Sequence, residues 1–151
     1  MKTGTFLVTH ADADAAVLRD VDDGQILTLD GNPGVEAGAV LEATLEPGPM
    51  DAVWTAVEIE RQYAVSVEAS PEPPTRQARE VAADQSVGEL TRRERAGTGE
   101  VHVLTVPPGE AEAAAADVVD DDATVERAAR LGVERVEVRS DEGVVSVRYL
   151  P

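Results

Sequence analysis

Short runs of alternating apolar and polar residues, separated by glycine- and proline-rich turns, cover the first half of this chain and restrict it to β-structure. The expected strands are residues 4–10, 16–20, 25–29, 39–46, 53–60 and 63–69. In the run VWTAVEIE, strict alternation directs Val57 and Ile59 to one face and Trp54 to the other. Five or six short strands at this spacing predict a small antiparallel β-barrel over residues 1–70.

A different pattern follows in residues 71–97. The segment SPEPP disfavours helix before each proline and forms an extended hinge. A helix is expected from about Thr75. Ser86 and Glu89 have the S-x-x-E spacing of a capping box, which predicts a second helix from Val87 to a stop at Gly97. This stretch therefore predicts a proline-rich hinge and a helical connector.

Residues 98–151 carry the pattern of a β-α-α-β-β unit. The strand EVHVLTV is followed by an alanine-rich apolar stripe, and then by aspartates 120–122, which can cap a second helix ending at Gly132. The last two strands, 133–138 and 144–150, flank the turn SDEG as a hairpin. The expected fold class is α+β, with the C-terminal unit either separate from the barrel or sharing one core with it.

Charge is distributed unevenly along the chain. The 151 residues include 30 acidic and 13 basic side chains, for a net charge of −17. Such a charge on a small domain is self-repelling in dilute buffer, but molar salt screens it within about 3 Å. The composition therefore favours a halophilic, salt-rich cytoplasm, and acidity here does not argue against a nucleic-acid partner. Residues 74–97 are the exception, because their arginines outnumber their acids.

Two resemblances accompany these patterns. Gly24–Leu29, the segment VEAGAVLEATLE and the following strand 53–60 resemble small OB-like nucleic-acid-binding barrels, including the TRAM type. The segments TGTFLVTHADADAAVLRDVDDGQ, PPTRQAREVAADQSVGELTRRERAGTGEVHVLTVP and AARLGVERVEVRSDEGVVSVRYLP resemble an uncharacterised, haloarchaea-restricted family of unknown function. The second resemblance covers nearly the whole chain and implies no activity.

The connector arginines are the main candidate binding residues, and Trp54 is the second candidate. The arginines are Arg76, Arg79, Arg92, Arg93 and Arg95. Guanidinium forks suit phosphate oxygens, but the same arginines could instead pair with acids of the flanking halves. An exposed Trp54 could stack on a base or anchor a protein, whereas a buried one belongs to a core.

Signatures of catalysis are not found in the sequence. There is no cysteine, and no phosphate-binding loop, nucleophile elbow, dinucleotide fingerprint or H-E-x-x-H motif. A metal could be ligated by His10, Asp12 and Asp14, but a polar turn explains these residues more simply. We interpret His102 as a half-buried residue of a strand. No catalytic residue, metal or cofactor is predicted.

The N-terminus lacks the apolar core of a signal peptide, and no apolar run is long enough to span a membrane. We therefore expect a cytoplasmic protein without a membrane partner. The function favoured by the sequence is a non-enzymatic binding module associated with RNA or a ribonucleoprotein such as the ribosome. The alternative is a protein–protein adaptor or a homodimeric structural protein.

Overall fold

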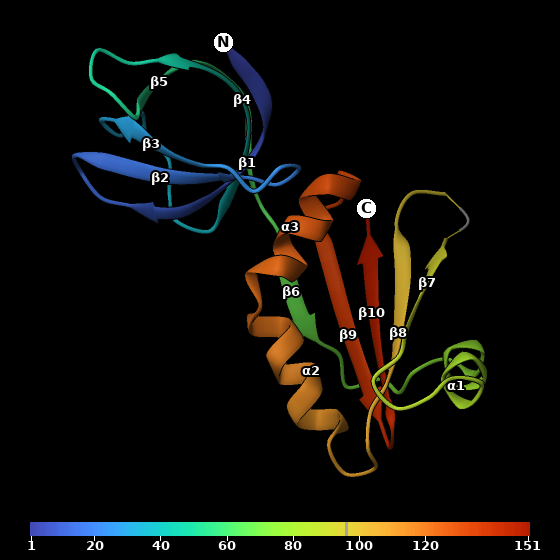
Figure 1. The fold of residues 1–151 in the computed structure, drawn as a ribbon. Coiled ribbons are helices and arrows are strands. Elements are labelled where there is room, and N and C mark those ends of the chain that lie inside the picture. Colours follow the sequence, from blue (N-terminus) through green and yellow to red (C-terminus); the bar gives the residue numbers. More distant parts are fainter. Residues whose placement is uncertain (96) are drawn as a thin grey trace. The chain divides into compact units, whose positions relative to one another are not determined.

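The computed structural model describes residues 1–95 and 97–151. Within these residues the chain forms ten strands and three helices, which confirms the predicted α+β class. The residues divide into two compact units, Met1–Val65 and Ser66–Pro151 (Figure 1). None of the helices in the described part of the chain combines the length and apolar character needed to cross a membrane.

The N-terminal unit is a closed ring of five strands. These are β1 (Lys2–Ala11), β2 (Ala15–Asp20), β3 (Ile26–Asp30), β4 (Ala39–Pro47) and β5 (Val53–Ala64). They pair in the order β1-β2-β3-β5-β4, and β4 pairs back with β1. Strand β4 pairs with β1 and not with β3, which leaves a gap between β3 and β4. Strand β5 fills this gap, antiparallel to β4 and parallel to β3. The expectation of purely antiparallel pairing is therefore wrong at this seam.

The interior of the ring is filled by the inward side chains of alternating strands. Phe6, Leu18 and Leu41 are among its most deeply buried members. A bulge in β5 changes the predicted alternation, since Leu45 pairs with Ala56 and Thr44 pairs with Glu58, which leaves Val57 without a partner in β4. Val57 is consequently half exposed, and Trp54, Ala56 and Ile59 pack against the core. The prediction that Val57 points inward opposite Trp54 is wrong for this reason.

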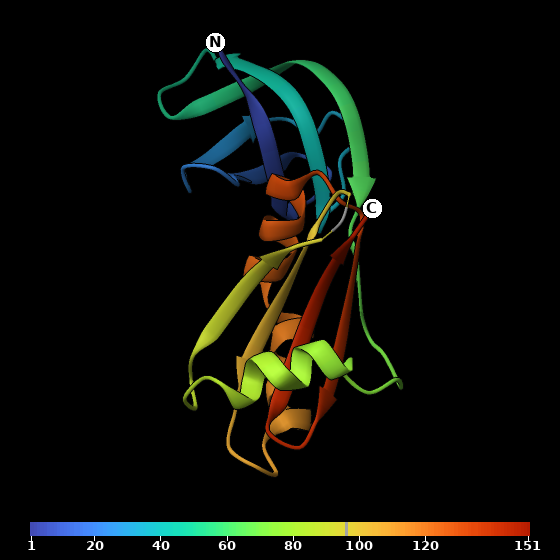
Figure 2. The ribbon, with the colours of Figure 1, turned by 90° about the vertical axis from the view of Figure 1, so that its right-hand side faces the viewer.

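The C-terminal unit is a five-stranded sheet with helices on both faces. Its elements are β6 (Ser66–Ala69), α1 (Arg76–Ala83), β7 (Leu90–Glu94), β8 (Glu100–Thr105), α2 (Ala111–Asp120), α3 (Asp122–Leu131), β9 (Arg135–Asp141) and β10 (Val144–Leu150). The strand order is β6-β9-β10-β8-β7. Helices α2 and α3 lie on one face, and α1 crosses the other (Figures 1 and 2).

Helices α1 and α3 begin on local capping signals, and α3 also ends on one. The Thr75 hydroxyl accepts a hydrogen bond from the Ala78 amide at the start of α1. The Asp121 carboxylate caps α3, and Gly132 ends that helix in the left-handed conformation. These ends agree with the sequence predictions.

The helix predicted to begin at Val87 is wrong, because the segment forms the edge strand β7. Gly88 has a φ of 89° and donates its amide to the carbonyl of Thr105, which turns the chain toward β8. Ser86 and Glu89 close a turn, since the Glu89 amide donates to the Ser86 carbonyl. Pairing with β8 thus overrides the helical propensity of leucine, arginine and glutamate.

Candidate functional site

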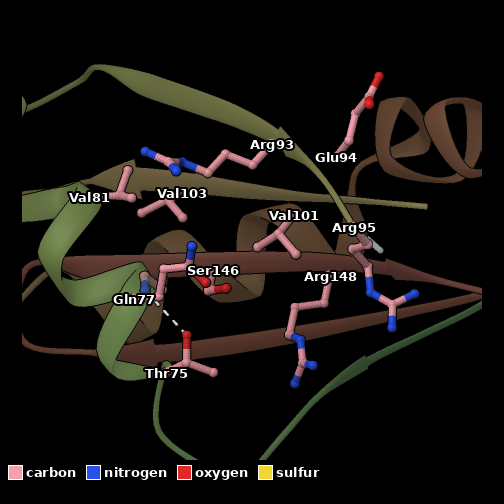
Figure 3. Close-up of a pocket in the computed structure, with 11 residues that line it drawn as sticks. Thr75, Gln77, Val81, Arg93, Glu94, Arg95, Val101, Val103, Ser146 and Arg148 are labelled. Carbon is pink, nitrogen blue, oxygen red and sulfur yellow. Dashed lines mark hydrogen bonds between the residues drawn. The ribbon is translucent and has the colours of Figure 1, made fainter. Parts of the chain in front are cut away.

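A cavity of about 630 Å³ opens on the α1 face of the C-terminal sheet. Residues of α1, β7, β8 and β10 line it, together with Arg95 just after β7 (Figure 3). Val81, Val101 and Val103 form its apolar part, and Arg93, Arg95 and Arg148 bring three positive charges to it. Glu94 also borders the cavity, but its side chain points away from the other lining side chains (Figure 3).

The sheet register explains why these side chains lie on one face of the sheet, although the Arg93 guanidinium extends toward Val81 and away from Arg95 and Arg148 (Figure 3). Directly paired residues of neighbouring strands share one face of a sheet. Arg93 pairs with Val101, and Val101 pairs with Arg148, so the two arginines flank this valine. Neighbouring strands lie about 4.8 Å apart, which places the two arginine Cα atoms roughly 10 Å from each other. Guanidinium groups on flexible stems at this separation can reach a single anionic group between them.

The three cavity arginines differ in how far they are already paired. Arg148 donates from Nη1 to Oε1 of Glu137 at 3.1 Å, and Arg95 donates from Nη1 to the Thr98 carbonyl at 2.9 Å. Among the described residues, none forms a hydrogen bond or ion pair with the exposed guanidinium of Arg93. Each arginine carries five N–H donors, so all three retain donors for a ligand.

Ser146 is a buried polar residue in the floor of this cavity. It lies on β10 between Val145 and Val147, pairs with Val103 of β8, and is 2% exposed. Its hydroxyl has no hydrogen-bond partner within residues 1–95 and 97–151. A hydroxyl without such a partner in the wall of a cavity is available to a molecule that enters it.

Only two of the five predicted arginines, Arg93 and Arg95, line the cavity. Arg92 precedes Arg93 on a strand, so its side chain faces the opposite side of the sheet, where its charge acts on His102. Arg76 pairs with Glu80 one turn along α1, and Arg79 pairs with Asp141 at 2.8 Å. The structure therefore does not gather all five arginines into one cluster.

Trp54 lies in the other unit. It is partly buried, packs against the core of the ring, and pairs with Leu29 across the parallel seam between β3 and β5. These contacts give Trp54 a packing role within the N-terminal unit.

Sequence reasoning missed Ser146 and Arg148. Both lie in the strand predicted at residues 144–150, where no binding role is predicted for them. The available signal was their spacing, because two polar residues at alternate positions of an otherwise apolar strand occupy one face together. That face is the one that carries the cavity.

A second polar cluster lies on the opposite face of the sheet. Arg127 of α3 donates to both carboxylate oxygens of Glu100 at 2.7 Å, and His102 Nε2 lies 2.8 Å from Glu100 Oε1. The His102 ring contacts Tyr149, with the ring centroids 4.8 Å apart. Burial lowers the pKa of His102, and the hydrogen bonds from Arg127 lower the pKa of Glu100. This cluster joins α3 to β8.

The predicted polar turn after β1 is closed by Asp12, whose Oδ1 accepts hydrogen bonds from the amides of Asp14 and Ala15. No group of three or more histidine, aspartate or glutamate residues in the described chain is placed to hold a metal ion.

Comparison with known proteins places the chain in a family. Searches among curated proteins and among solved structures found nothing similar. The model of DUF5812, a family of unknown function, matches residues 2–140, which is most of the chain and includes all the cavity residues except Ser146 and Arg148. The chain belongs to the DUF5812 family.

Proposed function

We propose that this protein is a non-enzymatic RNA-binding module that holds phosphate in the cavity of its C-terminal unit. The observation that carries the proposal is that Arg93, Arg95 and Arg148 line one cavity in a chain of net charge −17. Arginine forks match the oxygen geometry of phosphate, and a local positive cavity on an acidic protein steers an anion to one place.

The chemistry of the cavity also suits binding in high salt, the setting that the composition favours. Contacts to phosphate lose affinity steeply as salt concentration rises. A binder in molar salt needs contacts that salt does not screen, such as hydrogen bonds to neutral groups and apolar surface. Ser146 provides a hydroxyl, and the three valines provide an apolar surface beside the arginines.

The test is fluorescence anisotropy with a labelled single-stranded RNA in buffers from 0.2 to about 2 M KCl, a range in which phosphate contacts weaken progressively. We expect the Arg93→Glu/Arg95→Glu double variant to bind at least about tenfold more weakly than the wild type. The matched control is Arg76→Glu/Arg92→Glu, which changes charge equally outside the cavity and should retain affinity within about threefold. Absence of RNA binding by the wild type, or an equal loss in both double variants, would refute the proposal.

A protein partner is the second candidate, and the edge strand β7 favours it. The Thr105 amide donates to the Glu89 carbonyl, and the Arg95 amide donates to the Gly99 carbonyl. Because hydrogen-bonded pairs alternate along an antiparallel ladder, the backbone groups of Leu90, Arg92 and Glu94 point away from β8. Such an edge can add a strand from a second copy or another protein. Sedimentation in molar KCl tests self-association, and a single monomeric mass at all concentrations would argue against it.

A further inference from the structure

We propose that the cavity binds the phosphorylated end of an RNA chain, or a free nucleoside monophosphate, and not an internal phosphodiester. This inference rests on the proposed RNA-binding function and names the chemical group that the same site recognises. A terminal phosphate is a phosphomonoester, which carries close to two negative charges above its second pKa of about 6 and has three terminal oxygens. An internal phosphodiester has one charge and two such oxygens.

The first argument is the order of charges across the sheet. The register places five residues in one row on the cavity face, in the order Arg93, Val101, Arg148, Glu137, Glu68. The row is basic over β7 and β10 and acidic over β9 and β6. A polyanion that reaches Arg148 from the β7 edge first meets Glu137, whose carboxylate is already paired with Arg148 and Arg139, and then the exposed Glu68. The next phosphate would be repelled by Glu68, so the anionic chain is best placed with its end at Arg148.

The second argument is that α1 blocks the other direction along the sheet. Ala78, Val81 and Ala82 of α1 pack on Val103 and Val144. The exposed part of the sheet face therefore ends where the helix crosses it (Figure 2). An RNA strand running along β8 and β10 cannot continue past this contact. The cavity is thus bounded by a helix on one side and by carboxylates on another.

The third argument is the number and kind of donors in the cavity. Three arginines and the unpartnered Ser146 hydroxyl can together serve the oxygens of a single dianion. The volume of about 630 Å³ lies within the range of small-ligand pockets and leaves room for a sugar and base beside the valines. An internal phosphodiester would leave several of these donors without an acceptor.

The experiment compares one RNA sequence in three forms, with a 5′-phosphate, with a 3′-phosphate, and with hydroxyl groups at both ends. Binding is measured by competition against a labelled 5′-phosphorylated oligonucleotide in molar KCl, with adenosine monophosphate and inorganic phosphate as further competitors. We expect at least one phosphorylated form to bind about tenfold more tightly than the hydroxyl-ended form. The 5′ and 3′ forms distinguish the two ends, and the monophosphate should compete better than inorganic phosphate.

Two variants sharpen the test. Ser146→Ala should reduce affinity for the phosphorylated oligonucleotide about threefold to tenfold and leave the hydroxyl-ended form nearly unchanged. Glu68→Lys removes an acid from the row beyond Arg148 and should raise affinity for the hydroxyl-ended form about threefold. Glu112→Lys is the matched control, because Glu112 is exposed on α2, across the sheet from the cavity.

The outcomes separate the two proposals. Equal binding of all three RNA forms would overturn end recognition while leaving RNA binding intact. If the monophosphate bound but no RNA form did, RNA binding would fail and recognition of a phosphomonoester would stand. If neither RNA nor the monophosphate bound, both proposals would fail.

Discussion

The two faces of the C-terminal sheet are built from the same strands but have opposite compositions. On β10, Val145, Val147 and Tyr149 point to the face covered by α2 and α3, and all three are buried. The alternate residues Ser146 and Arg148 point to the face crossed by α1, which carries the cavity. The covered face therefore carries apolar side chains along β10, whereas the open face carries Ser146 and Arg148 beside the smaller apolar cluster of Val103 and Val144. One strand thus serves packing and the proposed binding site at the same time.

The largest expected effect tests whether the covered face is the stabilising one. Val145→Asp should lower the free energy of unfolding by at least about 3 kcal/mol, because it buries an unpaired carboxylate at a fully buried position. Arg93→Asp on the open face should change stability by less than about 0.5 kcal/mol. Urea unfolding in molar KCl measures both. Similar losses in the two variants would break the distinction between the faces.

The turn that holds β7 against the sheet should show the next largest effect. A Cβ atom at Gly99 would clash with the Tyr149 carbonyl oxygen, and the φ of 108° at Gly99 is unfavourable for other residues. Gly99→Ala should therefore cost about 3 kcal/mol and weaken ligand binding by displacing Arg93 and Arg95. Gly97→Ala has a similar φ but open space around it, so it should cost about 1 kcal/mol. Equal unfolding midpoints for the two variants would contradict this account.

A smaller, pH-dependent effect is expected on the covered face. Burial lowers the pKa of His102 in the folded state, so below pH 6.5 the unfolded chain takes up a proton more readily than the folded chain. Stability should therefore fall as the pH drops through 6.5 toward the lowered pKa, and His102→Gln should flatten this fall. The lowered pKa of Glu100 adds a further loss only below pH 4.5.

Thermal unfolding between pH 5 and 8 measures the His102 contribution. A His10→Gln variant controls for the loss of a histidine as such. If His102→Gln left the slope of stability against pH unchanged, the buried imidazole would not be its source.

The smallest effect should come from the ion pair that joins α1 to the open face. Arg79 and Asp141 are 2.8 Å apart, but both side chains are about half exposed. A double-mutant cycle of Arg79→Ala and Asp141→Ala should give a coupling of about 0.2–1 kcal/mol, and less in molar salt. A coupling above about 2 kcal/mol would mean that α1 is held by this pair rather than by its apolar contacts.

The parts of the fold that depend on local signals were predictable from the sequence. The cap at Asp121, the stop at Gly132 and the final hairpin all follow from residues within a few positions of each other. Strand β7 was not predictable in this way, because LTRRE consists largely of helix-forming residues and becomes a strand only by pairing with β8. The bulge at Val57 likewise depends on the register with β4.

The candidate site was predictable only in part. Arg93 and Arg95 stood out because they lie in the least acidic stretch of the chain. The side of the sheet to which Arg92 points depends on whether this segment is a helix or a strand, and the helix predicted from Val87 is wrong. The spacing of Ser146 and Arg148 indicates that they share a face of their strand, but their position beside Arg93 depends on pairing between strands far apart in sequence.

The seam that closes the N-terminal ring has a consequence for its motions. β3 and β5 are joined through only two residue pairs, Thr28 with Val53 and Leu29 with Trp54, whereas β4 and β5 pair along most of their length. Opening of the ring should therefore begin at this seam, and its amides should exchange with solvent before those of β4. Because Trp54 is the sole tryptophan of the chain, its fluorescence reports on that opening without any engineered label.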